Sequence, residues 1–307
     1  MENENKCIAY FNGERIRNFP PHVRVLWYGQ FSEAYCNGAI MNYVESCLSK
    51  IKKNLLCVIP VGDGNHSMKN ININSIIDKY QPKSKNLIIG TLAQIHEDPE
   101  LSYLYLPLSD SFFMHGTRFE KELVPWENRQ AIAFWRGSCS GSFYTYYSET
   151  TRYRTVKELL NYKNSNVKLT KRYNWHLNTK VTIPEEYFDN ECDLSDFFKY
   201  KIVLIIDGNT IASSHMWTFA TGAVPVMISN ATCWFSKFLK PFIHYVPVRY
   251  DLSDLKEMIE WLINNDAKAK EIAENALFFS REYFSSEFQK KYIEDELQHF
   301  ASQQNIS

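Results

Sequence analysis

The chain has almost no net charge, because its 34 lysines and arginines are matched by 35 aspartates and glutamates in 307 residues. A protein that gathers nucleic acid or anionic lipid over its whole surface carries an excess of positive charge. The balance excludes that class and confines any anion site to a local group of residues. Long apolar runs are missing too, since none approaches the roughly 18 residues that a membrane helix needs. We expect no nucleic-acid partner and no membrane span.

Paired cysteines are also missing. The seven cysteines form an odd number, and none of them stands in a C-x-x-C pair. This usage excludes a disulfide framework and a cysteine zinc site, and it fits reduced thiols. The opening MENENKCIAY has neither the basic nor the apolar region of a secretory signal. We expect a cytoplasmic protein.

Several chemical motifs are absent. The sequence has no G-x-x-x-x-G-K-[ST], no H-E-x-x-H and no G-x-S-x-G, which excludes the phosphate loop, the zinc helix and the nucleophile elbow. It also has no Asp-x-Asp, the acidic pair that can hold a divalent ion against a diphosphate. A metal is therefore not expected, and arginines and helix ends would have to balance a bound diphosphate.

Apolar strand patterns alternate with helical patterns along the chain, which predicts an α/β fold with parallel sheets. The length suits two domains, and the polar segment 125–129 is the expected boundary between residues 1–128 and 129–307. The expected strands are 8–15, 23–28, 55–61, 87–90, 131–135, 167–169 and 202–206, with extended segments around 103–106 and 112–114. The expected helices are 31–53, 73–80, 152–160, 193–199 and a tail over 253–286.

Asp63 stands where the strand 55–61 runs into a glycine-containing turn. Ligands of open α/β sheets bind at the carboxyl ends of strands, so a carboxylate here faces the expected crevice. The alternative is an Asx turn that bonds only its own loop. The dinucleotide pattern G-x-G-x-x-G fails because Ser67 replaces the third glycine, so a dehydrogenase rests on Gly62 and Gly64 alone.

Arg152 and Arg154 open the helix that follows strand 131–135 and Ser138. Basic side chains oppose the dipole at a helix start, which indicates an anion beside them. Solvated surface arginines are the alternative.

A third polar group follows strand 202–206 at the start of the next expected helix. Hydroxyls and N–H groups at that position could bind phosphate or ribose, although a buried histidine is more often structural. The group consists of Asp207, Thr210, Ser213, Ser214 and His215.

Over residues 55–285 the chain resembles glycosyltransferase family 90, which includes capsule-associated xylosyltransferases and protein O-glucosyltransferases. The motifs that carry the resemblance are VIPVGDG, VPWENRQAIAFWRGS, YKIVLIIDGNTIAS, FATGAVPV and the long block that begins LKPFIHYVPVRYDLSDL.

The resemblance implies two Rossmann-like domains that face a central cleft, the GT-B architecture. The amino-terminal domain would bind the acceptor and the carboxyl-terminal domain a UDP-sugar, without an obligatory metal or cofactor. The family's catalytic Asp falls on Asp63 as general base, and its donor-binding Ser and Arg fall on Ser138 and Arg154. Arg152 is the second candidate for the arginine.

The implied function is inverting transfer of xylose or glucose from UDP to a hydroxyl of a glycan or glycoprotein. One departure stands out, because the family's donor turn A-S-x-R ends in His215 here. The departure favours an alternative, a non-catalytic carbohydrate-binding protein that keeps the fold.

Overall fold

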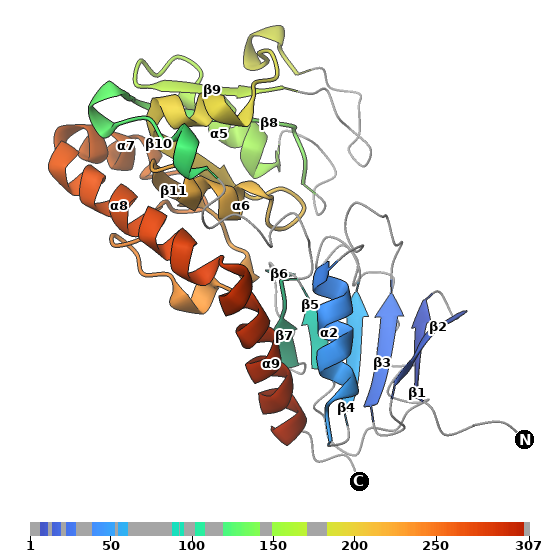
Figure 1. Ribbon diagram of the computed structural model, residues 1–307. Coiled ribbons are helices and arrows are strands. Elements are labelled where there is room, and N and C mark those ends of the chain that lie inside the picture. The colour runs from blue at the N-terminus through green and yellow to red at the C-terminus, as the bar shows by residue number, and fades with distance from the viewer. Residues whose placement is uncertain are drawn as a thin grey trace, which may run out of the picture. The chain divides into compact units, whose positions relative to one another are not determined.

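The computed structural model describes residues 7–11, 14–19, 23–28, 39–52, 55–60, 88–91, 93–94, 102–107, 119–141, 149–170 and 183–303. The chain divides into two compact units. Unit 1 comprises Met1–Phe113, Thr232–Trp234 and Ser286–Ser307, and unit 2 comprises Met114–Ala231 and Phe235–Ser285. Each unit is built on its own sheet (Figure 1).

The main sheet of unit 1 has the strand order β2-β1-β3-β4-β5-β7. From β1 to β7 the neighbouring strands are parallel. The strands are β1 (Cys7–Phe11), β2 (Glu14–Phe19), β3 (Val23–Tyr28), β4 (Leu55–Pro60), β5 (Ile88–Thr91) and β7 (Ser102–Tyr105). The short strands β6 (Ala93–Gln94) and β12 (Thr232–Cys233) form a separate antiparallel pair.

One edge of this sheet differs from the all-parallel prediction, because β1 and β2 pair antiparallel. Only Asn12 and Gly13 separate the two strands in sequence. A parallel pair needs a crossover of a dozen or more residues, whereas two residues can join antiparallel neighbours.

Two helices complete the described part of unit 1, α2 (Ala39–Ser49) and α9 (Ser286–Gln303). The Tyr43 hydroxyl on α2 donates to Glu294 Oε1 on α9 over 2.6 Å. On α9, the Tyr292 hydroxyl donates to the Tyr105 carbonyl in β7 over 2.9 Å. Helix α9 is thus bonded to elements that lie within the first 105 residues of the chain.

The sheet of unit 2 is entirely parallel, with the order β13-β11-β10-β8-β9. Its central strand β10 (Tyr200–Ile206) reads YKIVLII, an apolar run typical of a strand covered on both faces. The other strands are β8 (Gln130–Gly137), β9 (Ser165–Leu169), β11 (Val224–Ile228) and β13 (Val246–Pro247).

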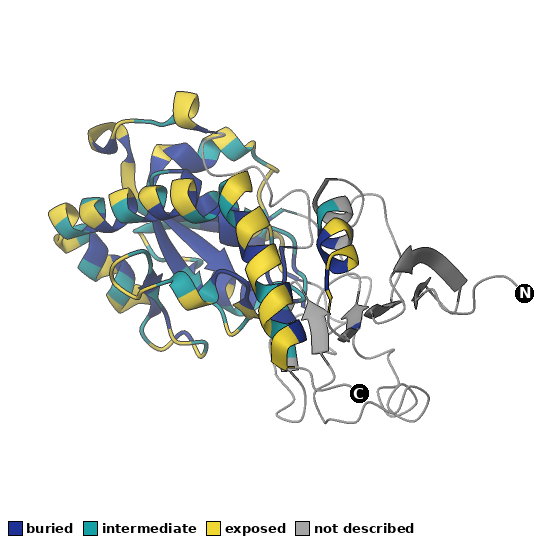
Figure 2. Ribbon diagram, turned by 60° about the horizontal axis from the view of Figure 1, so that its bottom comes forward, coloured by how far each residue is buried: buried dark blue, intermediate teal, exposed yellow. Residues whose placement is uncertain are grey.

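Both faces of β10 are packed (Figure 2). Ile202, Leu204 and Ile206 share a core with α5 (Thr151–Leu159), α7 (Leu255–Asn264) and α8 (Asp266–Tyr283). Val203 points to the opposite face and packs with Phe197 of the 3-10 helix η6 (Leu194–Lys199). The period of two along a strand produces this division.

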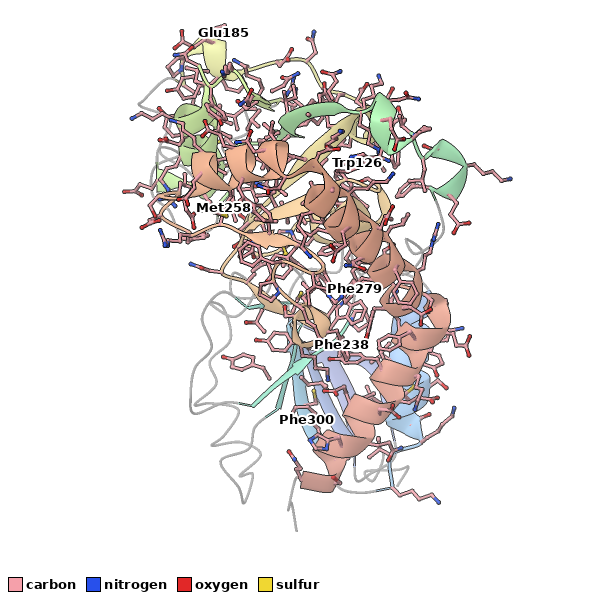
Figure 3. The ribbon with its side chains drawn as sticks, turned by 90° about the vertical axis from the view of Figure 1, so that its left-hand side faces the viewer. Trp126, Glu185, Phe238, Met258, Phe279 and Phe300 are labelled. Carbon is pink, nitrogen blue, oxygen red and sulfur yellow. The ribbon has the colours of Figure 1, made fainter. Side chains whose placement is uncertain are left out.

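The expected helical tail over 253–286 is present as α7 and α8. They separate at Asn265, whose backbone leaves the helical region while its side-chain amide donates to the Trp261 carbonyl. Near the end of α8, Tyr283 stacks between Phe279 and Phe238 at centroid distances of 4.5 and 4.9 Å, and these two phenylalanines are labelled in Figure 3.

The other sequence predictions agree with the described elements to within a few residues, except that helix 31–53 is seen only as Ala39–Ser49. The segment 193–199 is a 3-10 helix instead of an α-helix, capped by Asp193 and Asp196. The predicted helix 73–80 and extended segment 112–114 lie outside the described residues.

Candidate functional site

The candidate site lies in unit 2, where β8, β10 and β11 end at the same edge of the sheet. Because the three strands are parallel, the residues that follow them meet there. These residues are Ser138 after β8, Asp207 after β10 and Ser229 after β11.

Asp207 joins two of these strand ends and is only 1% exposed. Its Oδ1 accepts from the Ser229 hydroxyl over 2.6 Å and lies 3.0 Å from His215 Nε2. Its Oδ2 accepts from the Asn230 backbone N–H over 2.8 Å. A buried carboxylate is tolerated only when it is hydrogen-bonded in this way. Asp207 therefore has a structural role, in which it holds together the segments that follow β10 and β11.

His215 lies on the short helix α6 (Ser214–Trp217) and is also 1% exposed. Its Nδ1 accepts from the Ala212 N–H over 3.1 Å, so the ring proton is on Nε2, which donates to Asp207. Both nitrogens are therefore used within the protein. These contacts favour the structural alternative, and phosphate binding by His215 stays a prediction.

Arg152 joins the ends of β8 and β10. Its Nη1 donates to the Ser138 carbonyl over 3.0 Å and to the Ser140 hydroxyl over 2.7 Å, and its Nε donates to the Asp207 carbonyl over 3.1 Å. Its guanidinium also lies 5.6 Å from the centre of the Trp135 ring. Arg152 is 7% exposed, so it is a buried clamp and does not match the solvated surface arginine of the alternative.

This clamp needs glycine at position 208. A Cβ there would lie 2.9 Å from Arg152 Nη2 and 3.0 Å from Ser140 Oγ. The backbone and the guanidinium can approach so closely only because Gly208 has no side chain.

Arg154 points to a different neighbourhood, as two residues correspond to about 200° around a helix. Its Nη2 donates to the Tyr250 carbonyl over 3.0 Å, and its guanidinium lies 5.7 Å from the centre of the Tyr250 ring. Its Nε is buried and has no hydrogen-bond partner among the described residues. Arg154 therefore keeps donor capacity that none of the described residues uses.

The predicted hydroxyls have unequal surroundings. Ser138 Oγ lies 3.5 Å from Arg152 Nη1. Thr210 is 1% exposed, its carbonyl accepts from the Gly208 N–H over 2.9 Å, and its Oγ1 has no described partner. At the start of α6, Ser213 is exposed and Ser214 is 8% exposed.

The structure thus brings Ser138, Arg152, Asp207 and His215 into one connected group and leaves Arg154 apart from it. Sequence reasoning missed Ser229, Asn230 and Tyr250. The first two follow the buried strand β11, and the rule that singled out Asp207 applies to them equally. Tyr250 follows a strand of only two residues, which gives no such pattern.

Asp63, the predicted general base, lies outside the residues that the structure describes. In the described part of the chain, His, Cys, Asp and Glu form no group of three or more that could hold a metal ion. Among the same residues, no helix has the length and apolar character needed to cross a membrane.

Known proteins resemble parts of this chain. The uncharacterized protein 179R of Invertebrate iridescent virus 6 is 33% identical over 199 residues, which cover 56% of this chain and 17% of that protein. Human Protein O-glucosyltransferase 1 is 27% identical over 195 residues, which cover 60% of this chain and 46% of that protein. The chain thus spans less than half the length of these relatives.

Among solved structures, a glycosyltransferase from Rickettsia africae ESF-5 aligns over 91% of this chain and 76% of its own, with 10% identity and a TM-score of 0.45. This distant likeness carries no part of the assignment. The sequence model of glycosyl transferase family 90 matches residues 111–307, more than half of the chain, and the chain belongs to that family.

Proposed function

We propose that this chain is an inverting glycosyltransferase that moves glucose or xylose from UDP to a hydroxyl of a glycan or glycoprotein. Its family supports sugar transfer. The name of the human relative, Protein O-glucosyltransferase 1, supports glucose as one donor sugar and a protein as one acceptor. The proposal includes the two-domain GT-B arrangement, which stays a prediction.

One observation carries the proposal. Arg154 lies in the first turn of α5, where the helix dipole disfavours a cation. Its Nε is buried without a described partner, and the described carboxylate that attracts its charge, Asp251, is itself exposed to solvent. An unsatisfied buried donor on a charged group costs about 1–3 kcal/mol or more. A bound anion would remove that cost, and the diphosphate of a nucleotide sugar fits the guanidinium fork.

In the proposed reaction the acceptor oxygen attacks the anomeric carbon from the face opposite UDP. The bond from that carbon to the diphosphate oxygen breaks, and the UDP oxygen takes the bonding pair. Asp63 takes the acceptor proton as general base, and Arg154 stabilises the negative charge that develops on the diphosphate.

The proposal assigns charge neutralisation to arginine and not to an obligatory metal. Transfer measured in EDTA should match transfer in added Mg²⁺ or Mn²⁺. Activity that disappears in EDTA and returns with one of these ions would refute metal independence without refuting sugar transfer.

The test of the function is release of UDP from UDP-glucose and UDP-xylose, together with UDP affinity by calorimetry. Arg154→Ala should weaken UDP binding at least tenfold, because it removes a charged hydrogen bond worth about 1.5–3 kcal/mol. Lys157→Ala is the matched control, since Lys157 is an exposed base on the same helix. Equal UDP affinity in wild type and Arg154→Ala would contradict the assigned role.

The alternative, a non-catalytic carbohydrate-binding protein, is favoured by one observation. By the resemblance described above, His215 takes the place of the family's donor-binding arginine, and both of its nitrogens are used by Asp207 and Ala212. A binding protein should release no UDP from any UDP-sugar, whereas a transferase usually loses some sugar to water. Binding of sugar without any release of UDP would therefore select the alternative.

A further inference from the structure

The turn that follows β13 holds the guanidinium of Arg154. Tyr250 contacts it in two ways, through the backbone carbonyl at 3.0 Å from Nη2 and through the ring at 5.7 Å from the central carbon. The first contact fixes one corner of the fork, and the second lies within the range of a cation–π interaction. Among the described residues, Nη2 is the one guanidinium nitrogen of Arg154 that forms a hydrogen bond, and Nε has no partner.

The turn itself is tightly bonded. The Asp251 carboxylate accepts from the Ser253 N–H over 2.9 Å, and the Asp254 carboxylate accepts from the Arg249 N–H over 2.9 Å. A hydrogen bond of 2.8 Å also runs from the Leu252 N–H to the Arg249 carbonyl. These bonds surround Tyr250 on both sides in sequence, so its carbonyl is held in place.

The backbone of Leu252 is a second indication that the surrounding structure fixes the conformation of this turn. Leu252 has a φ of +68° although it is neither glycine nor asparagine, and its side chain is only 8% exposed. Such a backbone conformation is costly for a leucine and persists only where the surroundings impose it. Strain of this kind gathers at functional sites.

We propose that Tyr250 is a positioning residue, which holds Arg154 so that its unused donors meet the diphosphate of the sugar donor. This inference rests on the proposed function and deepens it. A loose arginine would lose rotamer freedom when the ligand binds, whereas a held arginine has lost it already. The ring of Tyr250, and not its hydroxyl, is the part that this role requires.

Two substitutions distinguish the effect of the aromatic π system of Tyr250 from the effect of the space that its side chain fills. Tyr250→Phe keeps the aromatic face, and Tyr250→Leu keeps an apolar side chain in the partly buried position but has no π system. Neither removes the backbone carbonyl. UDP dissociation constants should be within twofold of wild type for Phe and about 3- to 10-fold weaker for Leu.

Uridine serves as the probe without phosphates. Since the role of Tyr250 acts through Arg154 and phosphate, uridine affinity should be the same in wild type, Tyr250→Phe and Tyr250→Leu. Equal loss of UDP and uridine affinity in the Leu variant would indicate a general disturbance of the site and would overturn the inference.

A double-mutant cycle completes the test. In an Arg154→Ala background the Tyr250→Leu change should have no further effect on UDP affinity, because the residue on which it acts is gone. Additive losses would overturn the positioning role while leaving the proposed function intact. A wild-type chain that binds no UDP would overturn the proposed function and this inference with it.

Discussion

His215 donates a hydrogen bond to Asp207 over 3.0 Å, and each of these side chains is 1% exposed. The contact joins the start of α6 to the end of β10, and the same carboxylate reaches the two residues that follow β11. One aspartate therefore holds three segments at the candidate edge. Its loss should lower the stability of the fold more than it lowers ligand affinity.

Replacing Asp207 with Asn should destabilise the chain by about 3 kcal/mol. The amide keeps one acceptor, but its NH2 group meets donors that the carboxylate had satisfied. Urea unfolding measures the change. The matched control is Glu271→Gln, which removes an exposed charge paired with Lys268 on α8 and should cost under about 1 kcal/mol. Equal losses in both variants would contradict the structural role of Asp207.

A methyl group at position 208 should disturb the arginine clamp. Gly208→Ala places Cβ 2.9 Å from Arg152 Nη2, so the guanidinium or the strand end must shift, at a cost of about 1–3 kcal/mol. In an Arg152→Met background, where no guanidinium is present, the same glycine substitution should cost less. Thermal unfolding of the four chains measures this coupling, and strictly additive losses would show that the two positions do not interact.

Alkaline pH should weaken the contact between α9 and β7. Burial raises the pKa of Tyr292 above its ordinary value near 10, so the folded chain keeps a proton that the unfolded chain loses. Because the unfolded state then binds fewer protons, the unfolding free energy falls as pH rises above about 10.

The Tyr292→Phe variant separates that effect from simple packing. At pH 7 it should be less stable by about 1 kcal/mol, the net value of the lost hydrogen bond to Tyr105. Above pH 10 its stability should fall less steeply than that of the wild type, by up to about 1.4 kcal/mol per pH unit. Parallel pH profiles from urea unfolding would contradict the prediction.

Asp63→Asn should reduce sugar transfer by about 10²- to 10⁴-fold, because the amide cannot accept the acceptor proton. UDP affinity should stay within twofold of wild type, since the proposed base acts on the acceptor and not on the nucleotide. Steady-state kinetics and calorimetry together measure the two effects. Unchanged turnover in this variant would remove Asp63 from the mechanism.

Much of the fold follows from local sequence patterns. The run at 202–206 predicted a strand covered on both faces, and β10 is such a strand. The β1 and β2 pair was predicted less well, because weak alternation over 8–15 merged two strands that Asn12 and Gly13 separate. Side-chain periodicity identifies a strand, but the direction of its neighbour depends on the length of the connection.

The sequence predicted which polar residues stand at the strand ends and the helix start, but not which contacts they make. Strand ends pointed to Ser138 and Asp207, and a cation at a helix start pointed to Arg152 and Arg154. Sequence alone could not tell the roles of the two arginines apart. Arg152 and Arg154 stand two and four residues after Thr150, and they differ only in the direction in which the helix points their side chains. Arg152 donates to the carbonyl groups of Asp207 and Ile206, which lie more than 50 residues away in the chain. No local sequence pattern predicts such contacts.

The position of α9 has a consequence for biosynthesis. The helix Ser286–Gln303 belongs to unit 1, although most of that unit is translated first. An emerging polypeptide therefore cannot complete this unit until residues 286–303 have been made, although the strands of its main sheet all precede residue 106. A premature stop codon after residue 285 would spare every described strand and still remove α9 from this unit.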